Sequence, residues 1–152
     1  MSDNPYDLLK LENQLCFPLY AAARATIRLY KPLLDRLDLT YTQYITMMVL
    51  WERQSLTAKE LGDLLFLDSG TLTPLLKKME AKGYLTRKRS SADERSLVVT
   101  VTDRGMALRE EALSVPKAMA ECLTLPKEEA MTLYDILYKM LGREGMAPKA
   151  FL

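Results

Sequence analysis

Apolar residues recur at helical spacing along most of the chain. Between Leu15 and Leu37 they follow the three- and four-residue steps of an amphipathic helix. Because proline is tolerated in the first turn of a helix and disrupts later turns, Pro18 places the start of this helix close to residue 18. The helical pattern resumes at Thr102 and is interrupted at Pro116 and Pro126. These positions predict a mainly helical protein.

Two capping boxes predict the starts of two further helices. Thr40 is followed three residues later by Gln43, and Thr57 is followed at the same spacing by Glu60. In such a box the threonine accepts a hydrogen bond from an unpaired backbone N–H, and the Gln or Glu side chain reaches back to the cap. The second of these helices is expected to run to about Leu65.

Another helix start follows within a few residues. Asp68 and Ser69 form a good N-cap pair, and Gly83 is placed to end the helix that begins there. The apolar stripe of this helix consists of Leu72, Leu75, Leu76 and Met79. Two helices separated by a turn of three or four residues form a helix-turn-helix.

Two strand-like runs come next, Leu85 to Arg89 and Leu97 to Thr102, joined by the polar stretch SSADERS. We expect them to form one strand pair, a β-hairpin beside the helix-turn-helix. The predicted fold is therefore mainly α with a small β-hairpin, in a single chain spanning residues 1–152. A winged helix-turn-helix occupies residues 40–102, and helical regions flank it at residues 8–38 and 103–142.

Composition removes several classes of enzyme. The 152 residues are 49% hydrophobic and 27% charged, which is ordinary for one soluble globular domain. The chain has no histidine, which excludes Ser-His-Asp and Cys-His catalysis and the zinc sites that use histidine. Two cysteines cannot form a four-thiolate zinc site. Much conventional enzymology is therefore excluded, and we expect no metal and no cofactor.

The two cysteines are expected to be reduced thiols. The longest uncharged run, residues 39–51, is too short to cross a membrane, and the acidic N-terminus lacks the features of a signal peptide. These features predict a cytoplasmic protein, and the cytoplasm keeps thiols reduced. Cys16 and Cys122 are then either inert core thiols or transient redox groups. The apolar and aromatic neighbours of Cys16 suit a core thiol, whereas a position at a helix N-terminus suits a redox group, because the helix dipole stabilises a thiolate. Both interpretations of Cys16 stay open at this point.

Positive charge gathers over the second helix of the predicted helix-turn-helix and over the hairpin. Residues 77–109 contain nine basic and four acidic side chains, which gives +5 in a chain whose net charge is +1. A basic segment over a second helix and a wing is typical of phosphate contact, although a charged face in contact only with solvent would look similar. The candidate DNA contacts on the helix are Ser69, Gly70, Thr71, Thr73, Pro74, Lys77 and Lys78, and those on the hairpin are Arg87, Asp93 and Arg95.

Two of these candidates carry specific expectations. Arg95 at the hairpin tip suits the narrow minor groove, and Asp93 is placed to hold its guanidinium, unless the two charges only compensate each other in a polar turn. Pro74 lies beyond the first turn of its helix, so it is expected to cost a hydrogen bond and to bend the helix. The sequence offers no compensating feature for Pro74.

Four stretches resemble the MarR family of winged-helix repressors, and within it the organic-hydroperoxide-resistance repressors: LENQLCFPLY, YKPLLDRLDLTYTQY, LFLDSGTLTPLLKKMEAKG and RKRSSADERS. The resemblance covers almost the whole chain. It implies that Cys16 is a peroxide-reactive thiol and that Tyr30 and Tyr41 hydrogen-bond it in the reduced state. It also implies homodimers paired through the N- and C-terminal helices. In some members a second cysteine, near the position of Cys122, resolves the oxidised thiol across the dimer.

The sequence and this resemblance together predict a dimeric repressor of a palindromic double-stranded DNA operator. An organic hydroperoxide would convert Cys16 to a sulfenic acid, and capture by a second thiol would release the DNA. One alternative is a regulator of the same family that responds to hypochlorite or to a reversible phenolic ligand. A second alternative, from a different class, is a thiol peroxidase in which Cys16 turns over.

Overall fold

The computed structural model describes residues 4–122, 124–146 and 148. By its internal contacts the chain divides into two units, residues 1–112 and residues 113–152. The elements of the first unit are the 3-10 turns η1 (Pro5–Leu9) and η2 (Leu11–Asn13), helices α1 (Cys16–Asp35), α2 (Tyr41–Arg53), α3 (Ala58–Leu65), α4 (Ser69–Ala81) and α5 (Asp103–Ala112), and strands β1 (Ser55–Thr57), β2 (Leu85–Arg89) and β3 (Leu97–Val101). The second unit contains α6 (Ser114–Cys122) and α7 (Lys127–Met140). Within the described part of the chain, none of the helices has the length and apolar character needed to span a bilayer.

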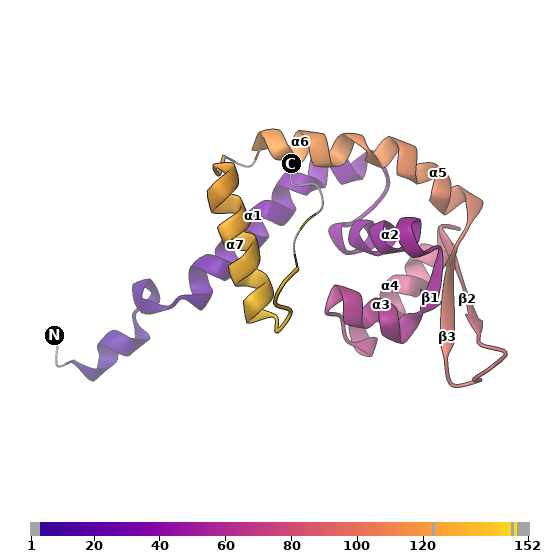
Figure 1. The fold of residues 1–152 in the computed structure, drawn as a ribbon, viewed down its shortest axis with the longest axis horizontal. Helices are drawn as coiled ribbons and strands as arrows, with labels where there is room; N and C mark the ends of the chain where they lie inside the picture. The colour runs from indigo at the N-terminus through magenta and orange to yellow at the C-terminus, as the bar shows by residue number, and fades with distance from the viewer. Residues whose placement is uncertain (1–3, 123, 147, 149–152) are drawn as a thin grey trace. The chain divides into compact units, whose positions relative to one another are not determined.

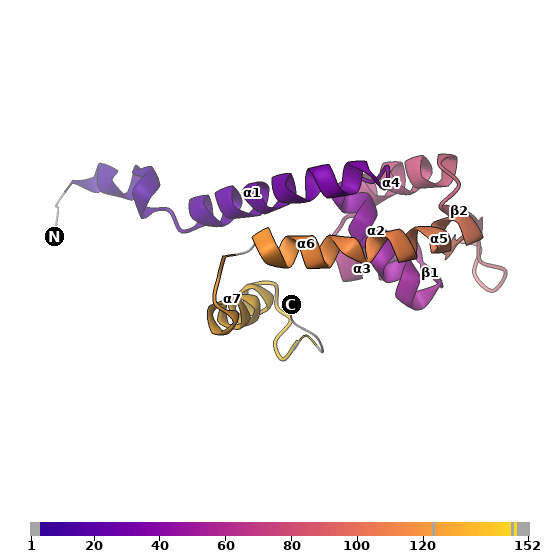
Figure 2. The same cartoon turned by 90° about the horizontal axis from the view of Figure 1, so that it is seen from above.

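Helix α1 begins where the sequence predicted. It is a continuous rod in the ribbon view (Figure 2). It starts at Cys16 and has Pro18 in its first turn. A proline there removes only a backbone N–H that the first turn would leave unpaired. The prediction that Cys16 stands at a helix N-terminus is therefore confirmed.

The three predicted caps are present. Thr40 and Gln43 make both hydrogen bonds of a capping box at the start of α2. Thr57 and Glu60 do the same at the start of α3. Asp68 Oδ1 accepts a hydrogen bond from the third residue of α4 at 2.8 Å. Local hydrogen bonding thus sets where the helices of the helix-turn-helix begin.

The predicted β-hairpin is confirmed, because β2 pairs with β3, but the sheet also contains a third strand that the sequence did not predict. The sheet has three antiparallel strands in the order β1-β3-β2, and β1 pairs with β3 through Leu56 opposite Val99 (Figure 1). The run Ser55–Thr57 ends on the N-cap of α3, Thr57, and has no strand pattern of its own. It becomes a strand because β3 supplies hydrogen-bond partners from more than 40 residues away in the sequence.

The core of the first unit forms around α2. Met47 and Leu50 on this helix are fully buried, as are Leu61 on α3 and Met79 on α4. Each such side chain contributes about 1.5–3 kcal/mol when it leaves water. Burial of these four side chains holds the two helices of the helix-turn-helix against α2.

A buried hydrogen bond attaches α5 to this core. Trp51 Nε1 at the end of α2 donates to the Gly105 carbonyl oxygen at 2.9 Å. Glycine is required at position 105 because the backbone of α5 lies very close to Tyr84 and Val101 there. A Cβ on residue 105 would collide with the backbone oxygen of Tyr84 and crowd the Val101 side chain. The start of α5 is therefore fixed against both α2 and the sheet.

Helix α4 runs through Pro74 from Ser69 to Ala81. Because proline has no N–H, the carbonyl of Gly70 four residues earlier cannot receive its usual hydrogen bond. Gly70 is exposed, so water can reach this carbonyl. Water can therefore replace the hydrogen bond that Pro74 removes, and this exposure is the compensating feature that the sequence did not offer.

We predict that Trp51→Phe lowers the free energy of unfolding by about 1–3 kcal/mol, because the buried Gly105 carbonyl loses its donor. Urea unfolding followed by far-UV circular dichroism measures the change. Ser55→Ala removes an exposed hydrogen bond to Thr100 in the same unit and is the matched control, expected to stay within about 0.5 kcal/mol of wild type. Equal midpoints for the two variants would contradict the importance assigned to this bond.

Candidate nucleic-acid interface and thiol site

Helix α4, the candidate recognition helix, has one buried face and one exposed face. Its four predicted core residues are buried. The exposed face carries every candidate DNA contact predicted on this helix: Ser69, Gly70, Thr71, Thr73, Pro74, Lys77 and Lys78. Small side chains lie in its N-terminal half and lysines in its C-terminal half, an arrangement suited to base edges and phosphates respectively.

The wing consists of β2, β3 and the loop that joins them. Asp93 orders the tip of this loop, but it does so without the predicted contact to the Arg95 guanidinium. Asp93 Oδ1 accepts a hydrogen bond from the backbone N–H of Arg95 at 3.0 Å. Its own backbone N–H donates to Ser90 Oγ. Asp93 therefore shapes the turn rather than holding the guanidinium. Within the described residues, the exposed Arg95 side chain has no ion pair.

Arg87, a predicted DNA contact, is paired with a carboxylate of α4. Its guanidinium makes two hydrogen bonds to Glu80 Oε2, at 3.0 and 2.8 Å, and its side chain is only 19% exposed. These bonds hold the pKa of Glu80 below its usual value, so the carboxylate stays charged at neutral pH. The wing also exposes Lys88 and Arg89, two cations that the sequence analysis did not single out. Their position within the basic segment 77–109 is the sequence feature that could have identified them as candidate DNA contacts.

A second polar cluster joins the α1–α2 turn to the end of α4. Lys82 Nζ donates to the Asp38 backbone oxygen at 2.6 Å and lies 3.1 Å from Asp38 Oδ1. The buried Tyr84 donates to Asp38 Oδ2 at 3.5 Å. Asp38 itself has a positive φ of 52°, a conformation that aspartate tolerates better than most residues. The turn that follows α1 is thereby attached to the recognition helix.

The structure brings the two predicted tyrosines together. The rings of Tyr30 on α1 and Tyr41 on α2 have centroids 4.9 Å apart, and Tyr44 lies 5.9 Å from Tyr30. Burial raises the pKa of Tyr30, with a further contribution from Tyr41. Burial, together with Tyr30 and Tyr41, raises the pKa of Tyr44 to about 12. The hydroxyls of Tyr30 and Tyr44 are therefore protonated at neutral pH and can donate hydrogen bonds.

Cys16 is not part of this cluster within one chain. It is the first residue of α1 and is exposed, whereas Tyr30 lies fourteen residues further along the same helix. At 1.5 Å per residue these positions are about 21 Å apart along the helix axis. Cys122, the last residue of α6, is also exposed. Neither thiol is buried inside its own chain, as an inert core thiol would be.

Large apolar side chains are exposed at both ends of the chain. In the N-terminal turns and the start of α1 they include Tyr6, Leu8, Leu9, Leu11 and Leu15, all more than half exposed. On α7 they include Met131, Leu133, Ile136 and Met140, between 42% and 57% exposed. Single apolar residues are normal on a surface, but this density is typical of a surface that packs against another protein.

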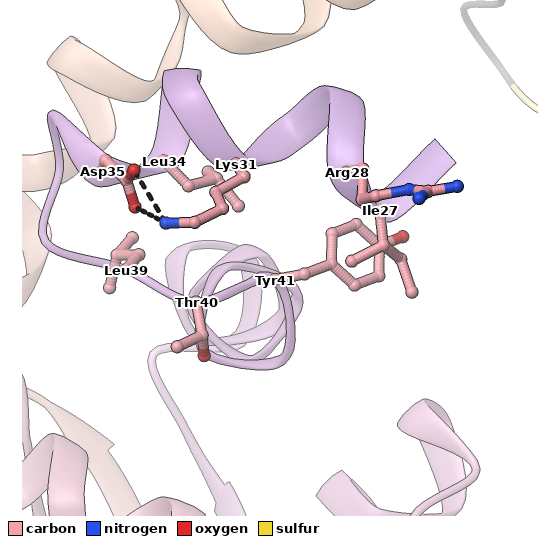
Figure 3. Close-up of a pocket in the computed structure, with 8 residues that line it drawn as sticks. All are labelled: Ile27, Arg28, Lys31, Leu34, Asp35, Leu39, Thr40 and Tyr41. Carbon is pink, nitrogen blue, oxygen red and sulfur yellow. Dashed lines mark hydrogen bonds and ion pairs between the residues drawn. The ribbon is translucent and has the colours of Figure 1, made fainter. Parts of the chain in front are cut away.

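A cavity of about 250 Å³ lies between α1 and the start of α2 (Figure 3). Its lining residues are Ile27, Arg28, Lys31, Leu34, Asp35, Leu39, Thr40 and Tyr41. Lys31 is paired with Asp35 at 2.9 Å across one helical turn. Arg28 takes part in no ion pair with another described residue. No three His, Cys, Asp or Glu side chains are placed to hold a metal ion in the part of the chain that the structure describes.

Comparison with known proteins agrees with this architecture. Residues 28–112 match the family model "Transcriptional regulator SarA/Rot". The chain is similar to the organic hydroperoxide resistance transcriptional regulator of Bacillus subtilis (strain 168), with 48% identity over 139 residues that cover 91% of this chain and 95% of the relative.

Solved structures show the same fold. AbfR of Staphylococcus epidermidis, reduced and bound to DNA, is 35% identical with a TM-score of 0.73, covering 90% of this chain and 94% of AbfR. The disulfide-formed state of AbfR matches at 34% identity and a TM-score of 0.64, and the match covers 90% of this chain and 93% of the AbfR chain. Wild-type MarR of E. coli is 27% identical with a TM-score of 0.66, covering 84% and 97%. These proteins are DNA-binding regulators and not enzymes, and the chain belongs to their family, the MarR/SarA family of winged-helix transcriptional regulators.

Proposed function

We propose that this regulator is a homodimer that holds a palindromic operator while Cys16 is reduced and releases it when an organic hydroperoxide oxidises Cys16. The observation that carries the proposal is the pair Tyr30 and Tyr41, whose rings meet at the packing of α1 on α2. Such a pair can donate hydrogen bonds to a thiolate. The similarity to a B. subtilis regulator of organic hydroperoxide resistance supports the choice of oxidant.

The thiol that these tyrosines meet would come from the second copy. Cys16 is about 21 Å along α1 from its own Tyr30, which is far beyond hydrogen-bond reach. An antiparallel pairing of two α1 helices would place the Cys16 end of each copy beside the tyrosine pair of the other. The exposed apolar side chains at the start of the chain and on α7 provide the surface for such a dimer.

The redox steps follow ordinary thiol chemistry. The Cys16 thiolate attacks the terminal oxygen of the hydroperoxide, the O–O bond breaks, and the alcohol leaves after taking up a proton. Cys16 is then a sulfenic acid. The thiol of Cys122 in the second copy attacks this sulfur, a disulfide forms and the hydroxyl leaves as water. Solved states of AbfR, one reduced on DNA and one disulfide-formed, support a switch of this kind.

DNA binding would use both copies. Each α4 would enter a major groove with its exposed face, and Arg95 on each wing would reach the adjacent minor groove. Two such modules fit half-sites about one helical turn apart, so a change in their spacing releases the operator. Loss of the Cys16–tyrosine hydrogen bonds would provide that change at the α1–α2 packing.

The cavity between α1 and α2 favours a second candidate function, release by a reversible small organic anion such as a phenolate. Its apolar walls and the Arg28 guanidinium suit an aromatic acid of modest size (Figure 3). An operator gel shift with Cys16→Ser distinguishes the two functions. Salicylate would release this variant in the second case, whereas no hydroperoxide would release it in the first.

We predict that Arg95→Ala weakens operator binding by about 1–3 kcal/mol, because the wing loses a groove contact. Lys77→Ala should weaken binding to every DNA sequence alike and reduce the salt dependence, as expected for a phosphate contact. Fluorescence anisotropy with operator and scrambled duplexes at several salt concentrations measures both effects. Unchanged operator affinity for Arg95→Ala would remove the wing from the mechanism.

A mixed dimer tests whether thiol and tyrosines come from opposite chains. One copy carries Cys16→Ser, and the other carries Tyr30→Phe with Tyr41→Phe. If the site is shared between subunits, this dimer keeps one complete site, and cumene hydroperoxide should oxidise its single Cys16 at the wild-type rate, followed by mass spectrometry over time. If the site lies within one chain, the mixed dimer has no complete site, and its Cys16 should be oxidised as slowly as in the double phenylalanine homodimer.

The two homodimers are the controls for this experiment. The Cys16→Ser homodimer should bind the operator like the reduced wild type and stay bound in organic hydroperoxide, hydrogen peroxide and hypochlorite. The double phenylalanine homodimer should be oxidised more slowly at Cys16. Normal release of Cys16→Ser in hydroperoxide would rule out Cys16 as the sensor.

Peroxide-treated wild type should shift to a covalent dimer on a non-reducing gel, because we propose a disulfide between Cys16 of one copy and Cys122 of the other. Cys16→Ser and Cys122→Ser should each abolish the shift. The Cα atoms of bridged cysteines lie within about 7 Å, which is the geometric demand on the oxidised dimer. A monomer band after complete oxidation of Cys16 would leave an external small thiol as the resolving partner.

A further inference from the structure

The recognition helix and the wing are joined by one carboxylate. Glu80 lies in the last turn of α4, and Arg87 lies in the middle of β2. Glu80 Oε2 accepts hydrogen bonds from Arg87 Nε at 3.0 Å and from Arg87 Nη2 at 2.8 Å. Glu80 Oε1 accepts a third hydrogen bond, from the backbone N–H of Arg87, at 2.8 Å. We call this arrangement the Glu80–Arg87 clamp.

The third bond makes the clamp more than a surface ion pair. Strand β2 is at the edge of the sheet, because the strand order is β1-β3-β2. The Arg87 N–H that bonds Glu80 is therefore an edge donor that β3 does not use. The carboxylate fixes the backbone of the wing strand as well as the guanidinium, so it sets how β2 lies against the end of α4.

From this geometry we infer that Glu80 is a positioning residue for DNA binding. The recognition helix and the wing must enter adjacent grooves of one duplex at the same time, so the angle between them decides whether Arg95 reaches its groove. Glu80 acts on the DNA through Arg87 and the wing backbone without contacting the DNA itself. This inference uses the DNA-binding property of the family and not the proposed peroxide response, so either can fail alone.

The sign of the effect separates positioning from simple electrostatics. Glu80 is an acidic residue inside the basic segment 77–109, where it reduces the attraction for phosphates. On charge alone, Glu80→Gln would tighten DNA binding. If the clamp positions the wing, the same substitution weakens operator binding, because an amide cannot hold the guanidinium as the carboxylate does.

The experiment measures operator affinity of the reduced protein by fluorescence anisotropy. We expect Glu80→Gln to raise Kd about tenfold, the size of one lost charge-assisted hydrogen bond. Glu94→Gln is the matched control: it removes an equal charge from the exposed wing loop and keeps the backbone oxygen that accepts from Arg89. Its affinity should be unchanged or higher. Wild-type or tighter binding by Glu80→Gln overturns the inference.

A double-mutant cycle with Arg95→Ala tests the route through the wing. In the Glu80→Gln background, Arg95→Ala should have a smaller effect than in wild type, because the wing is already displaced. Purely additive effects would overturn the inference even if Glu80→Gln binds weakly. Arg87→Lys is the second variant, since it keeps the positive charge but loses the forked donors. It should bind weakly like Glu80→Gln, and wild-type affinity for it would also overturn the inference.

Discussion

The buried face of α2 is the constraint on which the rest of the first unit depends. This helix packs against α1, α3, α4, α5 and the sheet, and its side chains Met47 and Leu50 are completely buried. Its first turn carries Tyr41 beside Tyr30, and its last turn carries Trp51, which fixes the start of α5. One helix therefore supports both the proposed sensing cluster and the proposed DNA-reading elements through a shared core.

The connection between sensing and reading is short. The turn between α1 and α2 is attached to the C-terminal end of α4 through Asp38 and Lys82, and the buried Tyr84 supports the same carboxylate. A change in the packing of α1 on α2, which the oxidation of Cys16 would cause in the proposed dimer, therefore reaches the recognition helix through contiguous contacts. No movement of the core itself is needed for this, since Asp38 lies in an exposed turn.

Two acidic residues fix the local structure of the basic segment 77–109, the proposed DNA-binding segment. Asp93 orders the wing tip through backbone hydrogen bonds, and Glu80 joins the wing to α4. Each reduces the local positive charge, which weakens general attraction to phosphate. Each also fixes the position of a neighbouring segment, which favours a single docking geometry. Charge counting over residues 77–109 indicated a candidate DNA-binding segment, but it could not assign these two structural roles.

The sequence by itself determined where the helices begin, because caps such as Thr40 with Gln43 and the helix start near Pro18 depend on residues a few positions apart. It also located the wing strands β2 and β3 and the exposed face of α4. Only the tertiary structure decided that Ser55–Thr57 is a strand and that Arg87 is held by Glu80. Both facts rest on contacts between separate elements, and local patterns carry no information about such contacts.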